Sequence, residues 1–228
     1  MGAAENTSMP AVVREYASWA LRGKPLQASR TVRVTQVGEM MLKPGASPRH
    51  FEAREEFAIG QVAFAWHARF PMLGPFALRV TDSYDGHEGR LEVRLLGIPV
   101  QRRQGPELAQ GEAYRYLAEI AWVPHAILAN RQLEWRELDG RTVEVTTLVA
   151  GERIAVRLSF NENGEIVSTE AERPRLEAGN AVTPWIGHYS DYQDLGGVRV
   201  PTRGEVRWDL PEGPFTYWRG RITSLELD

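Results

Sequence analysis

Short turns between alternating segments constrain the fold of this chain more than any other feature. Between residues 31 and 227, stretches of alternating apolar and polar residues are separated by turn-forming pairs, among them Asp85-Gly86, Asp139-Gly140, Asn163-Gly164 and Gly196-Gly197. Alternation with a period of two is typical of β-strands that bury one face. Connections of this length join antiparallel neighbours. The sequence therefore predicts a mainly β protein, in which about twelve strands form one antiparallel sheet that curves to protect its edges.

No composition shift or linker divides the chain, so residues 1–228 are expected to form a single domain. A first helix is predicted from about residue 9 to residue 22, with Ser8 as its N-cap and Gly23 as its C-terminal stop. The segment 175–184 is the least periodic and is expected to be a surface loop or lid. The expected order is an N-terminal helix (1–25), a first set of strands (31–100), a helical insertion (105–130) and a second set of strands (131–228).

The clearest helix within the series of strands follows Gly105-Pro106. A proline is tolerated there because the first turn of a helix has unpaired N–H groups in any case. Tyr116, Leu117 and Ile120 recur at three- and four-residue spacing and so share one face. We expect this face to pack on the concave side of the sheet. Pro124 disfavours helical geometry at the residue before it, so the helix should end or kink there.

The same helix holds the densest cluster of polar groups that could carry chemistry. If Glu119, Trp122 and His125 point into a cavity, a carboxyl group and an imidazole flank the end of the helix as candidate acid and base. The alternative is that Arg115 pairs with Glu119 in solvent, at the spacing of helical ion pairs, while Trp122 belongs to the core. The residue types alone leave both interpretations open.

Composition excludes several classes of function. The formal net charge is −3, and the 27 Lys and Arg residues are scattered without a basic run, which argues against a nucleic-acid partner. There is no cysteine, and therefore no disulfide framework and no thiolate chemistry. No apolar run approaches the roughly 20 residues that span a bilayer, and the N-terminus lacks the pattern of a secretory signal. A cytoplasmic protein is the expectation.

Sequence motifs for cofactors and metals are not found. No glycine-rich dinucleotide or phosphate-binding motif occurs, and no nucleophile elbow occurs. The five histidines stand singly, without the paired spacing of a metal site. We therefore expect no cofactor and no metal. These histidines are His50, His67, His87, His125 and His188.

The stretch Arg115-Tyr-Leu-Ala-Glu119, followed by Trp122 and Pro124, resembles the signature of a large, mostly uncharacterised bacterial family known only as a domain of unknown function. The resemblance runs from about Pro10 to Arg221. That family has no assigned catalytic residues, so the resemblance implies none here. Its further landmarks are Gly38-Glu39, Phe64-Ala-Trp-His-Ala-Arg69, Asp82-Ser-Tyr84, Arg94-Leu-Leu-Gly97, Pro184-Trp185, Asp191-Tyr192, Val200-Pro201, Gly204-Glu-Val-Arg-Trp208 and Gly213-Pro-Phe-Thr-Tyr-Trp-Arg-Gly-Arg221.

The pattern of strands around a helical insertion is also similar to the lipoprotein-carrier fold shared by LolA, LolB and the pigment-biosynthesis enzyme VioE. In that fold an open half-barrel of antiparallel strands wraps around helices and leaves an apolar cavity. The resemblance therefore implies an open half-barrel with the helical insertion against its concave face. It does not fix the function, because that fold serves both a lipid carrier and an enzyme without a cofactor.

The first functional hypothesis is a binding module for an apolar or amphipathic small molecule, held between the sheet and the insertion helix. The chain has seven Trp, seven Tyr and seven Phe, and ligand cavities are typically apolar with a few convergent polar groups. The alternative for each ring is that it only fills the core. Candidates for the cavity wall are Trp66, Tyr84, Tyr116, Trp122, Trp185, Tyr189 and Trp218.

The second hypothesis is a cofactor-independent enzyme of the cyclase, isomerase or lyase type, for example in natural-product biosynthesis. Such an enzyme needs a positioned acid and base, for which Glu119, His125 and Asp191 are the candidates. Asp82 lies on an apolar strand face, where its charge needs a partner such as Arg94 or Arg115. An ion pair that only fixes strand register would explain Asp82 equally well. A purely structural or partner-binding protein is a third interpretation.

Overall fold

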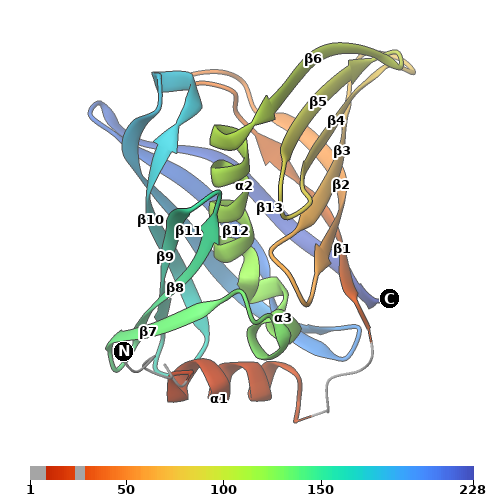
Figure 1. Ribbon diagram of the computed structural model, residues 1–228. Helices are drawn as coiled ribbons and strands as arrows, with labels where there is room; N and C mark the ends of the chain where they lie inside the picture. The colour runs from red at the N-terminus through yellow and green to blue at the C-terminus, as the bar shows by residue number, and fades with distance from the viewer. Residues whose placement is uncertain (1–8, 24–28) are drawn as a thin grey trace.

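Thirteen antiparallel strands form one curved sheet in the computed structural model, which describes residues 9–23 and 29–228 (Figure 1). The order across the sheet is β6-β5-β4-β3-β2-β1-β13-β12-β11-β10-β9-β8-β7. The strands are β1 (Thr31–Met40), β2 (Arg49–Ala58), β3 (Phe64–Pro71), β4 (Ala77–Tyr84), β5 (Gly89–Leu95), β6 (Ile98–Gly105), β7 (Glu134–Asp139), β8 (Thr142–Val149), β9 (Glu152–Phe160), β10 (Ile166–Arg175), β11 (Ala181–Leu195), β12 (Val198–Leu210) and β13 (Gly213–Leu227).

The first and last strands of the chain lie side by side in the middle of the sheet, where Val32 is opposite Leu227 and Met40 is opposite Trp218. From this centre each half proceeds outward as a meander, so β6 and β7 are the two edges. The helical insertion connects these edges and therefore crosses the open side of the half-barrel, in front of the concave face (Figure 1). The expected antiparallel sheet, interrupted only by the insertion, is confirmed. The single-domain assignment of residues 1–228 stays a prediction.

The insertion consists of α2 (Pro106–Ala118), a 3₁₀ turn η1 (Glu119–Trp122) and α3 (Pro124–Ala129). Pro106 occupies the first turn of α2, and Pro124 begins α3 after the chain has left α-helical geometry, as the sequence predicted. The predicted inner face is buried, with Tyr116, Leu117 and Ile120 almost fully removed from solvent. Helix α2 contacts strands from both halves of the sheet, so it packs across the concave side.

A glycine lets α2 approach the sheet closely. A Cβ atom at Gly89 of β5 would lie 2.5 Å from the backbone nitrogen of Ala109, which is well inside van der Waals contact. Any larger residue would therefore displace the helix or the strand. Gly89 thus fixes how deeply the first half of α2 lies in the half-barrel.

The N-terminal helix α1 (Ala11–Ala20) closes the end of the half-barrel beside α3 (Figure 1). Its Tyr16 hydroxyl donates a hydrogen bond of 2.9 Å to the carbonyl of Ala121 and so ties α1 to the insertion. Gly23 adopts a left-handed conformation, and its N–H donates to the carbonyl of Ser18, which is a C-terminal stop of the kind expected. The predicted cap Ser8 lies outside the described residues.

Two segments differ from the sequence prediction. Strand β6 (Ile98–Gly105) was not expected, and it brings the count from about twelve to thirteen. Its side chains are mostly exposed, so no buried face produces an alternating pattern, and Pro99 is tolerated because an edge strand pairs on one side only. The predicted loop 175–184 is much shorter than expected. Strands β10 and β11 pair as far as Arg175 and Ala181 despite two prolines, and only a short 3₁₀ turn, η2 (Leu176–Ala178), separates them.

Candidate functional site

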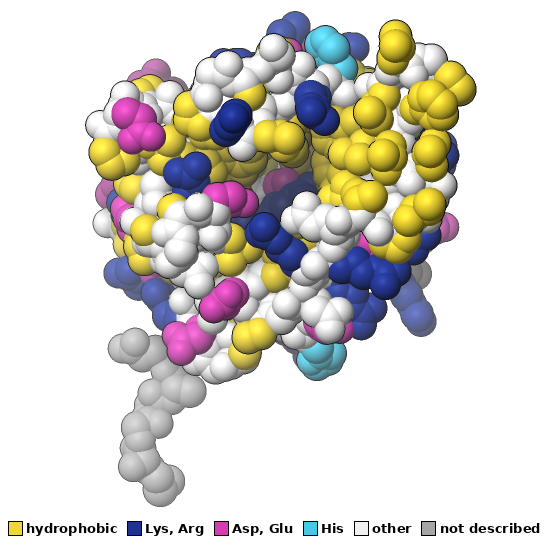
Figure 2. Space-filling model, turned by 90° about the horizontal axis from the view of Figure 1, so that it is seen from above, with side chains coloured by type: hydrophobic (Ala, Val, Ile, Leu, Met, Phe, Trp, Pro, Cys, Tyr) yellow, Lys and Arg dark blue, Asp and Glu magenta, His cyan; other side chains and the backbone are white. Residues whose placement is uncertain are grey.

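A cavity of about 400 Å³ lies between the concave face of the sheet and the end of helix α2. Figure 2 views the molecule from above and shows this hollow bordered by hydrophobic and basic side chains. Its volume is in the range of pockets that hold small organic ligands. Most of its wall is apolar or aromatic, contributed by Met40, Leu42, Trp66, Phe70, Leu78, Val80, Leu91, Val93, Ala118, Trp122, Trp185, Tyr189, Val206, Tyr217 and Trp218.

Part of this wall is held rigidly by hydrogen bonds to the backbone. The indole N–H of Trp122 donates to the carbonyl of Pro201 at 3.0 Å, and the Tyr189 hydroxyl donates to the carbonyl of Ala118 at 2.7 Å. The two rings meet edge to face, with their centroids 5.6 Å apart. The residues expected from the sequence that do line the cavity are Trp66, Asp82, Arg115, Glu119, Trp122, Trp185, Tyr189 and Trp218.

Tyr84 and Tyr116 were expected at the wall but lie elsewhere. The Tyr116 hydroxyl donates to the carbonyl of Ala58 at 2.8 Å, because its face of α2 packs on β2 rather than toward the cavity. The Tyr84 hydroxyl donates to the carbonyl of Gly86 in the following turn, at 3.0 Å. Both rings are buried. They therefore fill the core, which is the alternative that the sequence left open.

Arg94 and Asp191 lie on the outside of the sheet. Arg94 alternates with the inward-facing Val93 and forms an exposed ion pair with Glu92. Asp191 was expected to share a face with Trp185 and Tyr189, but its backbone adopts a left-handed conformation with φ of 59°. This conformation interrupts the alternation of β11. The carboxylate of Asp191 instead accepts hydrogen bonds from Thr202 and Arg203. Hydrogen bonding with Gln193, and then with Thr202 and Arg203, holds the pKa of this exposed acid below its usual value.

His125 is also outside the cavity lining. It lies in α3, where its side chain is buried and its Nδ1 atom has no hydrogen-bond partner among the described residues. Burial lowers the pKa of His125 to about 4, so the imidazole is neutral at physiological pH. Of the three candidate catalytic residues, only Glu119 lines the cavity.

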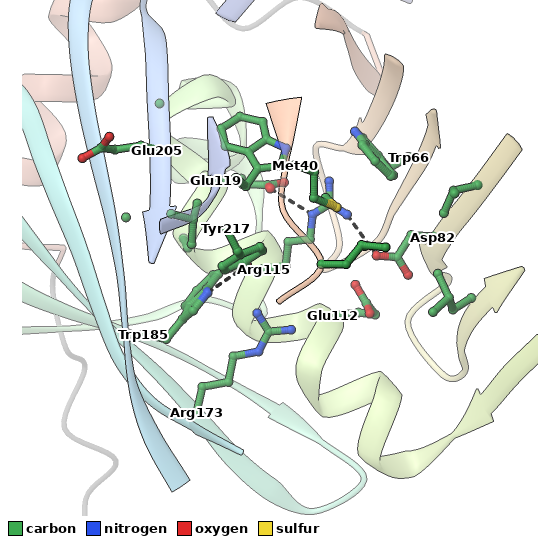
Figure 3. A pocket seen from close by; sticks show the side chains of 18 of the residues that line it. Met40, Trp66, Asp82, Glu112, Arg115, Glu119, Arg173, Trp185, Glu205 and Tyr217 are labelled. Atoms are coloured by element: carbon green, nitrogen blue, oxygen red, sulfur yellow. Dashed lines mark hydrogen bonds and ion pairs between the residues drawn. The ribbon is translucent and has the colours of Figure 1, made fainter. Parts of the chain in front are cut away.

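Arg115 is the centre of a buried ion network at the base of the cavity (Figure 3). Its Nη2 atom is 2.6 Å from Glu55 Oε1, its Nη1 atom is 3.0 Å from Asp82 Oδ2, and its Nε atom is 2.9 Å from Glu119 Oε1. Arg115 rather than Arg94 is thus the partner of Asp82. The Glu55 side chain is fully buried and that of Arg115 is 15% exposed, so these charges depend on one another rather than on water.

Neighbouring rings and amides complete this network. The guanidinium of Arg115 lies over the rings of Phe64 and Trp66, at 4.8 and 5.1 Å from their centroids, which is the geometry of a cation–π contact. The indole N–H of Trp66 donates to Gln36 Oε1 at 2.9 Å, and Gln36 Nε2 donates to Glu55 Oε2 at 2.6 Å. Trp66 of β3 is therefore linked to Gln36 of β1, Gln36 to Glu55 of β2, and Glu55 to Arg115 of α2.

Four carboxyl groups surround the one guanidinium of Arg115, so the cluster holds protons as well as charge pairs. Burial raises the pKa of Glu55 well above its usual value, against the effect of Arg115, and the nearby Glu119 raises it further. Burial likewise raises the pKa of Glu112, and the charge of Asp82 adds to this shift. Burial also raises the pKa of Asp82, although Arg115 opposes it.

The remaining oxygen atoms of the cluster fit this arrangement. Asp82 Oδ1, Glu112 Oε2 and Glu119 Oε2 are buried and have no N–H or neutral O–H donor among the described residues. An ionised oxygen without a donor is costly to bury, whereas a carboxyl group that keeps its proton can donate to the neighbouring carboxylate. Figure 3 shows the carboxyl groups of Asp82 and Glu112 close to each other. The base of the cavity is therefore a buried cluster in which one guanidinium is paired with three carboxyl groups and lies near a fourth.

Arg173 of β10 forms a second cationic group in the cavity. Its guanidinium lies over the Trp185 ring at 4.6 Å from the centroid, and more distantly over Trp208 at 5.8 Å. The indole N–H of Trp185 in turn donates to the Tyr217 hydroxyl at 3.0 Å (Figure 3). Arg173 of β10, Trp185 of β11 and Tyr217 of β13 form the side of the cavity opposite β4 and β5.

Sequence reasoning missed several polar residues of this site. Glu55 had a usable signal, because it interrupts an apolar strand face between Ala53 and Phe57, as Asp82 interrupts its own. Gln36 follows Val32 and Val34 on a buried face in the same way. Glu112, Arg173 and Tyr217 had no comparable local signal, since each lies beside other polar or exposed residues in the sequence. The missed set is Gln36, Glu55, Glu112, Arg173 and Tyr217.

Neither a cluster of metal ligands nor a membrane-crossing helix is present within residues 9–23 and 29–228. In this part of the chain no group of three or more His, Asp or Glu side chains is arranged to hold a metal ion. No helix there is both long and apolar enough to cross a membrane.

The fold is similar to solved structures of low sequence identity. The crystal structure of a LolA superfamily protein from Nitrosomonas europaea matches with a TM-score of 0.50 and 13% identity, over 96% of this chain and 94% of that chain. A DUF1329 family protein from Desulfovibrio piger matches with a TM-score of 0.48 and 12% identity, over 96% and 94% of the two chains. The first of these likenesses shows a LolA-like fold, as the sequence resemblance implied. No curated protein sequence matches this chain.

A family model identifies the chain more directly than these structures do. The model matches nearly the whole sequence, including every strand up to the middle of β13 and the complete helical insertion. It agrees with the resemblance carried by the Arg115–Pro124 stretch. The chain therefore belongs to a family of unknown function, DUF6544, whose model matches residues 1–220.

Proposed function

We propose that this protein binds an apolar or amphipathic small molecule in the cavity between the sheet and the insertion helix. The observation that carries the proposal is the cavity of about 400 Å³ itself, with aromatic and aliphatic walls and an ion network at its base. Protein interiors are normally close-packed, with few voids larger than a water molecule. The side chains that could fill this space, such as Trp122 and Tyr189, are hydrogen-bonded along its edge instead.

The shape of the site also supports ligand binding. The wall from β4 and β5 presents Leu78, Val80, Leu91 and Val93, which are only partly buried although they face inward. Covering such surface with an apolar ligand contributes about 25 cal/mol per Å² removed from water. The charged groups at the base are paired with one another, which leaves few of them to bind the ligand. A polar group on the ligand would therefore be oriented by a small number of contacts. Similarity to the LolA superfamily protein supports a fold able to enclose a ligand.

A fluorescent amphiphile tests this proposal. N-phenyl-1-naphthylamine is neutral and brightens in apolar surroundings, so it should gain fluorescence with one saturable site per protein. Val93→Trp would fill part of the cavity and should weaken binding by about tenfold or more, since it occupies the space of the ligand. Val100→Trp on β6 is the matched control, because Val100 is exposed and outside the cavity lining. If both variants bind the probe equally well, the cavity is not the binding site.

A second candidate function is a cofactor-independent enzyme, and one observation favours it. Glu112 and Asp82 are neighbouring buried carboxyl groups, and burial raises the pKa of both, as it does for carboxyl groups that serve as acids in enzymes. Glu119 lies beside them. The discriminating measurement is chromatography and mass spectrometry of amphiphiles after prolonged incubation with the protein. Unchanged ligands favour binding alone, whereas conversion that Glu112→Gln abolishes would establish catalysis.

We also propose that the protein is cytoplasmic, as expected from the sequence. The absence of cysteine is compatible with a reducing compartment but does not require one. Cell fractionation with an antibody against the protein would decide it, and recovery with the periplasmic fraction would overturn it.

A further inference from the structure

The hydrogen-bond donors of Arg173 are unused. This guanidinium lines the cavity, yet it forms no hydrogen bond and no ion pair with any residue in the described part of the chain. Its five N–H groups are held in place by the flat contact with Trp185. A partly buried guanidinium without an acceptor is unfavourable, because the hydrogen bonds lost to water are not replaced. Arg115 is the opposite case, since it forms ion pairs with three carboxyl groups.

The Tyr217 hydroxyl supplies a second unused donor near Arg173. Its oxygen accepts the hydrogen bond from Trp185, but its hydrogen is directed to no acceptor among the described residues. Arg173 and Tyr217 both contact Trp185, since the guanidinium lies 4.6 Å from the ring centroid and the hydroxyl accepts the indole N–H. Burial raises the pKa of Tyr217, although the charge of Arg173 opposes this shift. The hydroxyl therefore keeps its proton and can donate it to a ligand in the cavity.

The charge of the cavity beyond the Arg115 network is positive. Three arginines, Arg49, Arg103 and Arg173, line it without an ion pair to any described residue. Outside the Arg115 network, Glu177 is the one lining carboxylate that also lacks an ion pair among the described residues, since Glu205 pairs with Arg219. Figure 2 shows basic side chains at the border of the hollow. At the base, Asp82 Oδ1, Glu112 Oε2 and Glu119 Oε2 have no hydrogen-bond partner among the described residues, but they are buried within the Arg115 network. The part of the cavity outside that network thus offers unpaired donors and positive charge.

We propose that the ligand is an anionic amphiphile, whose carboxylate or phosphate group binds Arg173 and Tyr217 while its apolar chain lies along the wall formed by β4 and β5. This inference rests on the proposed binding function and names the chemical class of the ligand. A planar carboxylate or a phosphate matches the fork of N–H groups that a guanidinium presents. A cationic head group would instead meet the positive charge of Arg173, which forms no ion pair with any described residue.

Four amphiphiles that share one apolar chain test this inference. Dodecanoate, dodecyl phosphate, dodecanol and dodecylamine would each displace bound N-phenyl-1-naphthylamine from the full-length protein, below their micelle-forming concentrations. We expect dodecanoate, dodecyl phosphate or both to displace the probe at concentrations about ten- to a hundredfold lower than dodecanol, the usual effect of a charge-assisted hydrogen bond. The carboxylate and the phosphate distinguish a fatty-acid head group from a phosphorylated one.

Substitutions assign the preference to Arg173. Arg173→Met should bring the anionic amphiphiles to the level of dodecanol measured with the same variant, and Arg173→Lys should keep part of the preference. Arg175→Met is the matched control, because Arg175 is on the same strand but outside the cavity lining. Tyr217→Phe should lower the preference by a smaller factor. Circular dichroism would confirm that each variant is folded.

Each outcome of this experiment is informative. Equal displacement by all four amphiphiles, tighter binding of dodecylamine, or an unchanged preference in Arg173→Met would overturn the anionic ligand while leaving the proposed cavity function in place. Failure of the probe and of every amphiphile to bind would overturn the proposed function itself, and this inference with it.

Discussion

Glu55 of β2 and Arg115 of α2 are joined by an ion pair of 2.6 Å, although 60 residues separate them in the sequence. The pair links the sheet to the insertion helix at the base of the cavity. It therefore serves two purposes at once, since it positions the helix and places a compensated charge next to an apolar wall. The position of the helix and the charge at the base of the cavity therefore depend on the same ion pair.

Arg115→Met should destabilise the protein strongly. The substitution leaves Glu55, Asp82 and Glu119 without their shared cation, and breaking a buried ion pair typically costs about 3–5 kcal/mol. Chemical denaturation with urea measures the change. Arg102→Met is the control, because the pair of Arg102 with Glu92 is exposed and is expected to contribute less than about 1 kcal/mol. Similar losses in both variants would contradict the central position given to Arg115.

Leu117→Ala should lower the free energy of unfolding by about 2–5 kcal/mol, the usual cost of emptying a buried leucine site. Leu117 is fully buried between α2 and the concave face. The same substitution at Leu148, which is 69% exposed on β8, should change stability by no more than about 0.5 kcal/mol. Denaturant melts of both variants give the comparison, and a small effect at Leu117 would place this helix face in solvent.

Gly89→Ala should destabilise the docking of α2, whereas Gly140→Ala should be neutral or slightly stabilising. The added Cβ at Gly89 would lie 2.5 Å from a backbone nitrogen, which cannot move away as a flexible side chain would. Gly140 has no neighbouring atom within 4 Å of the same position and no left-handed backbone. We expect a loss of about 1–3 kcal/mol at Gly89, typical of overpacking. Thermal melting would reveal it, and equal melting temperatures would show that the helix has room to shift.

Glu112→Gln should make stability less dependent on pH above about 4.5, the usual pKa of a glutamate. The folded state raises the pKa of Glu112, so it retains a proton that the unfolded chain releases. Stability of the natural protein therefore falls as the pH rises from about 4.5 through the folded pKa. The glutamine variant carries no such proton, and its stability relative to the natural protein should increase over this range. At pH 4 both side chains are neutral, so the two proteins serve there as their own control.

His125→Leu should act on the acid side of the curve. Burial lowers the pKa of His125 to about 4 from the usual 6.5, so the unfolded chain binds a proton that the folded chain does not. Stability is therefore lost as the pH falls from about 6.5 to about 4, and the leucine variant should lose less of it. Urea melts at several pH values would show parallel curves if this interpretation is incorrect. Probe binding should be unchanged, because His125 does not line the cavity.

The sheet was predictable because its signals are local. Alternation within each strand and a turn pair after it specify a meander without any information from distant residues. The central pairing of β1 with β13 had no such signal, since it depends on how the whole sheet curves. Strand β6 lacked a buried face, and so the pattern that reveals a strand was missing there.

The site was predictable where a polar residue stood alone on an apolar face. Asp82 was found by this rule, and Glu55 obeys the same rule on β2. The rule failed at Asp191, where a left-handed backbone turns the side chain away from the face that alternation assigns to it. It gave no information on Arg173, because that residue is distinguished by hydrogen-bond donors that have no partner. A sequence does not show which donors stay unpaired.

The pairing of β1 with β13 has a consequence for synthesis on the ribosome. The six strands of the first half, β1 to β6, leave the ribosome long before β13, which pairs with β1. At about 5–20 residues per second, the delay is on the order of ten seconds or more. During that time β1 is an unprotected edge rather than the centre of a sheet. The newborn chain thus presents a template for unwanted β-pairing until β13 emerges.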